Sequence, residues 1–412
     1  MPTIADPRRM VGRGSLFCAL MLTPAGAAWA QETSVTPIAN VRLRFEAISQ
    51  DGIPRNADAL TVRARPGVIV KRDAVSAVVE GEATIALDRR FNDGFNGRSN
   101  LPLIPDADNF ELNRLALRYD GAYGSITAGR QLIELADQRF VGSSSFRQNQ
   151  QTFDSVRLQA KPTPRLSVDV TYAWSVRTPM GRKGHGARPE SIPGDNVFAL
   201  LGYATPIGAL TGFVYLIDQD DPAVQGYRLQ NRNLGARLVG TRELSPELRL
   251  SYVASYAWQS NHHRNPNRYN ANYYVGEVSL TRRALTGKVG YEVRGADDGR
   301  DFTSFQTPEG SALRFQGWAG RFAVTPPDGV RDLYAGISPS WNTHGIFEKV
   351  GIDLTGHRFE SDRLIRHYGS ELDLVASARI GAIAVMAGYA DYRADRFATD
   401  FRRGWLSVEW SL

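Results

Sequence analysis

The chain has 412 residues, of which 42% are hydrophobic, 10% aromatic and 22% charged, and its formal net charge is +6. A single cysteine excludes a fold built on disulfide bonds, and the many aromatic and β-branched residues argue against disorder. After residue 30 no apolar run approaches the roughly 18 residues that a membrane-spanning helix needs. The positive charge is too modest and too dispersed to predict nucleic-acid binding.

Residues 1–30 have the three parts of a secretory signal peptide. Three arginines before residue 14 make a positive segment, residues 15–23 are largely apolar, and Ala28-Trp29-Ala30 supplies small residues for cleavage. We therefore expect cleavage after Ala30, which leaves residues 31–412 as a single exported domain. The alternative is a buried N-terminal helix.

The rest of the sequence alternates between apolar and polar residues, which is typical of β-strands. The clearest segments, 166–176, 248–258 and 285–293, resemble in length a tilted strand that crosses a bilayer, about 9–11 residues. Soluble strands are shorter, about five or six residues. The predicted strands are, in chain order, 36–50, 58–72, 73–88, 108–120, 122–133, 151–161, 165–177, 195–205, 208–218, 228–241, 247–260, 270–282, 284–296, 330–338, 347–358, 366–379, 381–393 and 400–412.

Tight turns alternate with longer polar loops between these segments. The predicted long loops are 89–107, 134–150, 178–194, 219–227, 261–269 and 297–329. Short turns at one end and long loops at the other are typical of barrels in the bacterial outer membrane. A closed barrel also gives every backbone group a partner within lipid. We therefore predict an all-β fold, a transmembrane antiparallel β-barrel of about 18 strands, with a soluble all-β fold as the alternative.

On the predicted strands, the polar residues fall mostly at every second position, and many of these polar residues are charged. Each would cost about 2–4 kcal/mol in mid-bilayer, so they are expected to face an aqueous lumen. The predicted pore-lining residues are Arg42, Arg44, Glu80, Glu82, Arg114, Arg118, Lys161, Asp169, Arg237, Arg249, Lys288, Arg294, Asp353, Glu371 and Asp373. Arginines are richest in the early strands, which favours a positive field that attracts anions. The alternative is that arginines and acids pair across neighbouring strands and cancel.

The loop 134–150 follows Gly129-Arg130-Gln131 at the end of the fifth predicted strand. A long loop between close strands commonly folds into the lumen and narrows it, whereas the alternative is an external loop. The candidate constriction residues are Arg63, Arg65, Arg130, Arg139, Arg147 and Arg157.

The sequence lacks the motifs of zinc hydrolases, serine hydrolases and phosphate-binding loops. We therefore expect no enzyme activity, no catalytic residues, no metal and no cofactor. His262-His263 is expected to be a solvated loop tip rather than a metal site. The alternative function is a barrel enzyme or surface-binding barrel with an occluded lumen, for which His357 and Ser361 near the outer rim are the candidate pair.

Two blocks of motifs resemble the alginate export family of outer-membrane porins. They comprise residues 129–131, 137–142, 147–149 and 151–154, and then 305–308, 315–318 and 325–327. The resemblance implies a monomeric eighteen-stranded porin that conducts an anionic polysaccharide, with Arg130, Arg139 and Arg147 at the constriction. We therefore predict a passive channel for anionic or carbohydrate solutes. Its expected partners are outer-membrane lipid, lipopolysaccharide and the barrel assembly machinery.

Overall fold

The computed structural model describes residues 33–343 and 345–412, so the predicted signal peptide lies outside the described residues. Within these ranges the chain forms 18 strands and three short 3-10 helices. The strands are β1 (Ser34–Gln50), β2 (Ala57–Arg72), β3 (Val75–Arg90), β4 (Asn109–Gly121), β5 (Gly124–Gln131), β6 (Thr152–Thr163), β7 (Leu166–Arg177), β8 (Ser191–Thr205), β9 (Gly208–Ile217), β10 (Asn231–Ser245), β11 (Leu248–Asn261), β12 (Asn270–Arg282), β13 (Leu285–Arg294), β14 (Val330–Asn342), β15 (Lys349–Glu360), β16 (His367–Ile380), β17 (Ile383–Ala394) and β18 (Phe401–Ser411). The 3-10 helices are η1 (Gly181–Lys183), η2 (Gln225–Tyr227) and η3 (Ala312–Arg314).

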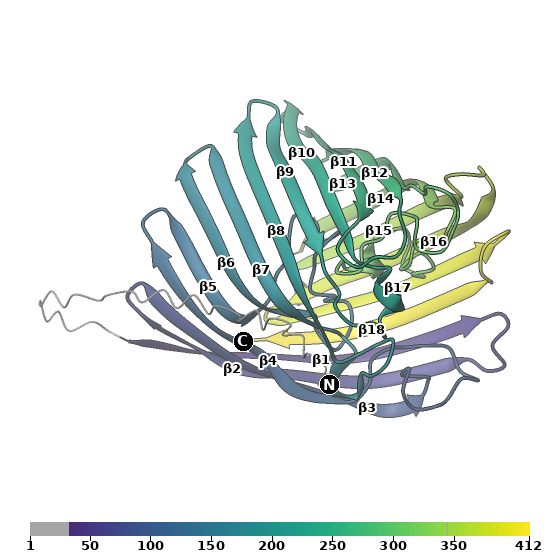
Figure 1. Cartoon of the computed structure of the whole chain (residues 1–412), viewed down its shortest axis with the longest axis horizontal. Helices are drawn as coiled ribbons and strands as arrows, with labels where there is room; N and C mark the ends of the chain where they lie inside the picture. Colours follow the sequence, from purple (N-terminus) through teal and green to yellow (C-terminus); the bar gives the residue numbers. More distant parts are fainter. Residues whose placement is uncertain (1–32, 344) are drawn as a thin grey trace, which may run out of the picture. The chain divides into compact units, whose positions relative to one another are not determined.

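Each strand pairs antiparallel with its neighbours in the sequence (Figure 1). The first and last strands also pair with each other, from Asn40 opposite Ser411 to Gln50 opposite Phe401, and this closes the sheet. The prediction of an antiparallel barrel of about 18 strands is therefore confirmed. Among the described residues, no helix is long and apolar enough to cross a membrane.

Most strand bounds differ from the predicted ones by a few residues, and at two ends where the strand is longer than predicted it contains a proline, which weakens a strand pattern. β8 begins at Ser191 rather than at 195, and Pro193 pairs with Ser175 after a register shift in β7. β14 continues to Asn342 rather than ending at 338, although Pro339 interrupts its pairing with β15.

The two faces of the sheet have opposite chemistry. Large apolar side chains point outward and are exposed, such as Leu117 and Ile126 on β4 and β5, whereas Arg63 and Arg294 are almost fully buried inside. A soluble protein would show the reverse. The arrangement fits a wall with lipid on one side and a polar interior on the other.

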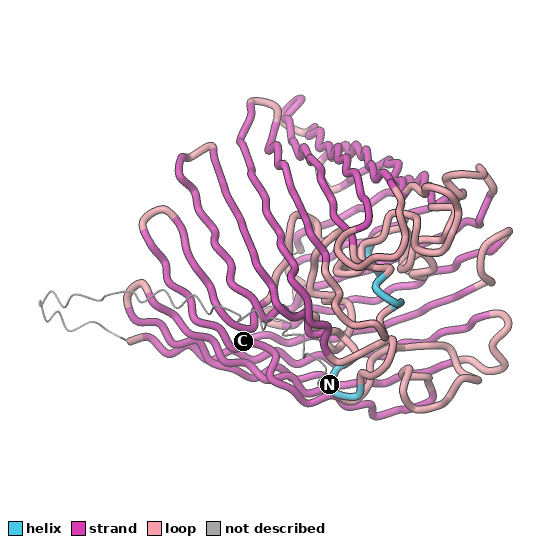
Figure 2. The backbone as a smooth tube through the Cα atoms, viewed as in Figure 1, coloured by secondary structure: helices cyan, strands magenta, loops and turns pink. Residues whose placement is uncertain are grey.

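The longer loops gather at the end of the barrel opposite the short turns, and some enter its interior (Figure 2). The β5–β6 loop (132–151) and the β13–β14 loop (295–329) meet there. The Gly142 N–H donates to the Glu309 carbonyl at 2.9 Å, and the Ser311 N–H donates to the Gln138 carbonyl at 2.9 Å. Phe140 packs against rings of the wall, including Tyr273 on β12 at 5.2 Å between centroids. The buried core thus lies between these loops and the wall.

Candidate functional site

The β5–β6 loop runs along the inner face of β1 and β2. Arg42 donates to the Ser145 carbonyl at 3.0 Å, and Arg65 donates to the Gln148 carbonyl at 3.0 Å. The Gln148 side chain donates to the hydroxyl of Thr61 at 2.8 Å. Side chains of the wall therefore hold the loop through its backbone, which places it inside the barrel.

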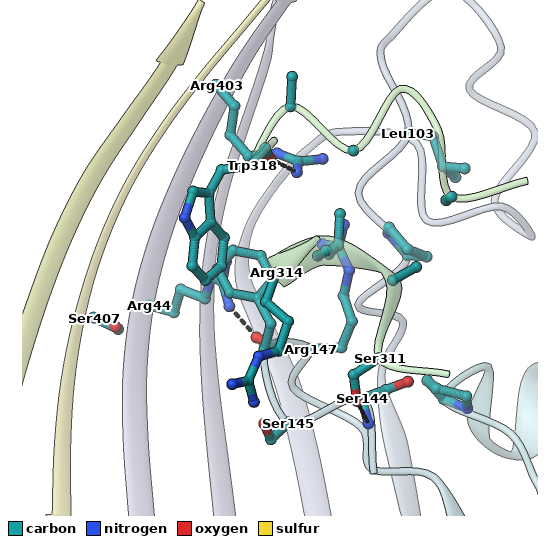
Figure 3. A pocket seen from close by; sticks show the side chains of 18 of the residues that line it. Arg44, Leu103, Ser144, Ser145, Arg147, Ser311, Arg314, Trp318, Arg403 and Ser407 are labelled. Atoms are coloured by element: carbon teal, nitrogen blue, oxygen red, sulfur yellow. Dashed lines mark hydrogen bonds between the residues drawn. The ribbon is translucent and has the colours of Figure 1, made fainter. Parts of the chain in front are cut away.

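A cavity of about 740 Å³ lies between the two interior loops and the wall formed by β1, β17 and β18 (Figure 3). We call it the arginine chamber, after the arginines among its lining residues. These are Arg42, Arg44, Arg147, Arg314, Arg321 and Arg403.

One buried carboxylate serves three of these arginines. Glu46 on β1 lies 3.1 Å from Arg44, 3.1 Å from Arg403 and 3.5 Å from Arg147. Asp106 adds a second buried carboxylate, 3.8 Å from Arg147, so two negative charges face three guanidinium groups. Burial without full compensation strengthens their field, because the interior screens charge less than water does.

A neighbouring carboxylate, Glu409, also faces more arginines than its single charge can neutralise. Glu409 on β18 pairs with Arg42 at 2.8 Å and with Arg63 at 3.1 Å. Arg314 and Arg321 come from the β13–β14 loop, and within the described ranges they form no ion pair. Burial lowers the pKa of Arg321, but a guanidinium still remains charged at neutral pH. The chamber is therefore electropositive.

Side chains of two strand residues form hydrogen bonds with both backbone polar groups of Trp318, in the β13–β14 loop. Its N–H donates to Asp373 at 3.1 Å, and its carbonyl accepts from Arg403 at 2.5 Å. The next N–H, of Ala319, donates to Glu371 at 2.6 Å. Gly317 makes this approach possible, because a Cβ atom there would lie 2.4 Å from the Glu371 carboxylate.

A second cavity, of about 280 Å³, adjoins the arginine chamber, and Arg314 and Trp318 line both. Its wall is rich in carboxylates. Several of them are paired: Asp137 with Arg237 at 2.9 Å, Asp353 with Lys288 at 3.1 Å and Asp332 with His357 at 3.0 Å. The interior therefore has a basic and an acidic sector, with Arg314 at the boundary between them.

Five of the six predicted constriction residues lie at three places in the barrel. Arg147 lines the arginine chamber, and Arg63 and Arg65 stand behind it, the latter paired with Glu82 at 2.6 Å. Arg139 is buried against Glu292 of β13 at 2.7 Å and joins the loop to the far wall. Arg157 on β6 forms a bidentate pair with Asp169 on β7 at 2.9 and 2.6 Å.

The expectation that Arg130 narrows the pore is corrected by its strand register. Arg130 lies opposite Leu115 on β4 and Asp154 on β6, and Leu115 is among the exposed outward residues. The guanidinium pairs with Asp154 at 2.7 and 2.9 Å. Ile126 lies four residues before Arg130 on β5 and points to the same face, so the sequence already indicated that Arg130 faces outward. The motif had suggested a place at the constriction, but parity decides the face.

Most other predicted lining residues are paired on the inner face. Glu80 bonds Arg114 at 2.9 and 2.5 Å, and Arg294 is buried with a bond to Gln316 at 2.5 Å. A cavity of about 620 Å³ near the short turns is lined by Arg118, Lys161 and Asp169, among others. Arg249 is exposed near a short turn.

Sequence reasoning missed Arg314, Arg321, Trp318 and Arg403. The inward position of Arg403 could have been predicted, because Arg403 lies an even number of residues before the inward-facing Glu409 on the same strand. The other three belong to an interior loop that lacks strand periodicity, so their positions follow only from contacts distant in the sequence.

The candidate enzyme pair is not brought together. The ring nitrogens of His357 face Asp332 at 3.0 Å and Asp373 at 3.5 Å, whereas the Ser361 hydroxyl accepts from the Arg366 N–H. Within the described ranges, no group of three or more His, Cys, Asp or Glu side chains is placed to hold a metal ion.

The sequence matches the model of the alginate export family over residues 38–295, more than half of the chain. The chain belongs to the alginate export family. The family predicted from the motifs is thereby confirmed. A search of curated proteins gave no significant match.

Solved structures of outer-membrane porins share the fold of this family member. OccAB4 of Acinetobacter baumannii has a TM-score of 0.69 at 13% identity, covering 93% of this chain and 99% of that one. OpdL of Pseudomonas aeruginosa has a TM-score of 0.64 at 14% identity, covering 92% and 98%. The outer membrane protein OpdK of Pseudomonas aeruginosa has a TM-score of 0.67 at 13% identity, covering 92% and 98%. The family and the fold together identify a porin-type barrel.

Proposed function

We propose that this barrel is a passive outer-membrane channel for anionic or carbohydrate solutes, with the arginine chamber as its narrow, selective region. The observation that carries the proposal is the excess of guanidinium groups around the chamber, where the two buried carboxylates of Glu46 and Asp106 face three arginines. Family membership supports the porin class, and the chamber's chemistry supports the solute class.

Rings of arginine favour anions because their field lowers the energy of a negative solute inside a narrow passage. Here carboxylates hold Arg42, Arg44, Arg147 and Arg403 in place, and the β13–β14 loop adds Arg314 and Arg321. A solute would therefore meet positive groups from both the barrel wall and the interior loops. A passive pore has no direction of its own, so gradients determine export or uptake.

The constriction in this proposal differs from the predicted set. It retains Arg147, backed by Arg63 and Arg65, and adds Arg314, Arg321 and Arg403, while Arg130, Arg139 and Arg157 have other roles. Outer-membrane lipid, lipopolysaccharide and the assembly machinery are the partners that this proposal implies, and a monomer is sufficient for it.

Planar-bilayer recording tests the proposal. Under a KCl gradient, the wild-type reversal potential is expected to show preference for chloride. The variant Arg314→Gln/Arg321→Gln removes two positive charges that face the chamber, so its reversal potential should move toward zero.

Arg130→Gln is the matched control, because Arg130 pairs with Asp154 on the outward face. It should retain the wild-type reversal potential. Absence of stepwise conductance in the wild type would contradict the channel, and an unchanged potential in the double variant would contradict this constriction.

A further inference from the structure

We infer that the arginine chamber prefers carboxylates with a flat apolar body, of the benzoate class, over polyhydroxylated uronates. This inference rests on the proposed function, since it names the solute class of the same chamber. It is carried by an aromatic platform inside the chamber, by the arginines beside that platform and by the apolar character of the remaining wall.

The platform consists of Phe146, Trp318 and Trp405. The ring centroids lie 5.3 Å apart for Phe146 and Trp318, 5.3 Å for Trp318 and Trp405, and 5.5 Å for Phe146 and Trp405. These distances are typical of packed aromatic rings. Trp405 is buried beneath the other two, whereas Phe146 and Trp318 are only half-buried and line the chamber.

Both exposed rings are fixed in place before any solute arrives. Trp318 is held through its N–H by Asp373 and through its carbonyl by Arg403. Arg44 donates to the Phe146 carbonyl, and Arg42 donates to the preceding carbonyl, of Ser145, at 3.0 Å. A platform that is already ordered costs a ligand little conformational entropy on binding.

Positive groups border the platform on both sides. The guanidinium carbon of Arg44 lies 3.6 Å from the Phe146 ring centroid, and the Trp318 indole stands between Arg44 and Arg403 (Figure 3). Arg314 is exposed to the chamber and has no ion-pair partner within the described ranges. Since Arg44 already covers one face of Phe146, a planar ring would stack on Trp318 while its carboxylate meets Arg314.

Most of the remaining lining residues are apolar, alongside the polar side chains of Gln50, Ser144, Ser145, Ser311 and Ser407. The lining includes Leu103, Pro105, Met180, Leu313 and Met386. A uronate carries several hydroxyl groups, and each hydroxyl that loses water without gaining a partner costs binding free energy. An aromatic acid has no such groups on its ring. The cavity of about 740 Å³ is also within the range of small-molecule sites, about 300–1,000 Å³.

Binding can be measured on the whole barrel in detergent, independently of conductance. Saturation-transfer NMR titrations would compare benzoate, galacturonate and the uncharged benzyl alcohol. Benzoate is expected to bind roughly tenfold more tightly than either. Trp318→Ala should weaken benzoate binding roughly three- to tenfold, the range that one aromatic contact supplies. Trp318→Phe keeps a ring and should restore most of the affinity.

Trp341→Ala is the control, since Trp341 is an exposed tryptophan near the end of β14 and away from the chamber lining. It should leave benzoate affinity unchanged. Equal affinity for benzoate and galacturonate, or wild-type benzoate affinity in Trp318→Ala, would overturn the inference. Either result could occur in a barrel that conducts chloride selectively, so it would leave the proposed function intact. Conversely, absence of conductance would overturn the channel while the binding data still decided the ligand class.

Discussion

A glycine on β17 makes room for the aromatic side of the arginine chamber. A Cβ atom on Gly388 would lie 2.0 Å from the indole of Trp405, which is closer than any side chain tolerates. Trp405 therefore lies flat across the backbone of β17, and its other contacts support Phe146 and Trp318. A position without a side chain thus determines where an aromatic surface stands.

The buried pair of Arg139 and Glu292 joins the β5–β6 loop to β13. Burial alone would lower the pKa of Arg139, but attraction to Glu292, 2.7 Å away, outweighs it and leaves the pKa above its usual value. The arginine therefore stays charged throughout the physiological range.

Removing one member of this pair should be costly. Arg139→Met leaves Glu292 buried without its partner, so the free energy of unfolding is expected to fall by about 3–5 kcal/mol. Urea titration of the refolded barrel would measure the loss. Arg139→Met/Glu292→Gln removes both charges and should recover most of the stability. A double variant as unstable as the single one would show that the charge is not the cause.

At the scale of elements, the two interior loops depend on each other. Within the described ranges neither loop contains a strand or an α-helix, and many of their backbone groups bond across the junction. The side chain of Gln151 donates to the Gly142 carbonyl at 2.8 Å in its own loop and to the Glu309 carbonyl at 2.9 Å in the other. The Ser144 N–H donates to the Ser311 hydroxyl at 3.1 Å. The chamber wall therefore persists only while both loops remain docked.

Glu309 makes this junction sensitive to pH. Burial raises the pKa of its carboxyl from 4.5 to about 7, although a hydrogen bond from Gln219 at 2.6 Å acts in the opposite direction. In the unfolded chain the proton leaves near pH 4.5, whereas the folded junction keeps it up to about pH 7. The docked state therefore loses about 3 kcal/mol of stability as pH rises through that window, and the loss levels off above it.

Hydrogen exchange followed by mass spectrometry would measure this effect. Peptides that contain the Gly142 and Ser311 amides should exchange faster at pH 8 than at pH 5, after correction for intrinsic rates. Glu309→Gln should exchange slowly at both pH values. Glu247→Gln, at an exposed turn between β10 and β11, is the control and should behave as the wild type does. Equal protection in the wild type at both pH values would contradict the assignment.

For the whole molecule, periodicity predicted the wall well and the interior poorly. The segment predicted at 165–177 is β7 (Leu166–Arg177), because a strand exposed to lipid on one face must alternate at every position. Trp318 could not be placed in this way. Its partners Asp373 and Arg403 lie 55 and 85 residues away along the chain, and a loop carries no period that would point to them.

The closing seam between β1 and β18 permits a direct test of the whole barrel. Leu43 lies opposite Val408, and both point outward. The sequence has one cysteine, Cys18, so Leu43→Cys/Val408→Cys would introduce the first pair within residues 33–412. Directly opposite residues have Cβ atoms about 4.5–5.5 Å apart, close to the spacing that a disulfide needs, so mild oxidation should link them.

The product should resist heat-induced unfolding on non-reducing gels and lose that resistance on reduction. The offset pair Leu43→Cys/Leu406→Cys is the control, because diagonal neighbours lie about 7–8 Å apart and should link slowly or not at all. Faster linkage of the offset pair would mean that the register at the seam differs by two residues. Since a shift of two keeps every side chain on its face, the lumen would remain polar. Glu409, however, would no longer lie opposite Arg42, and the charge balance of the arginine chamber would change with it.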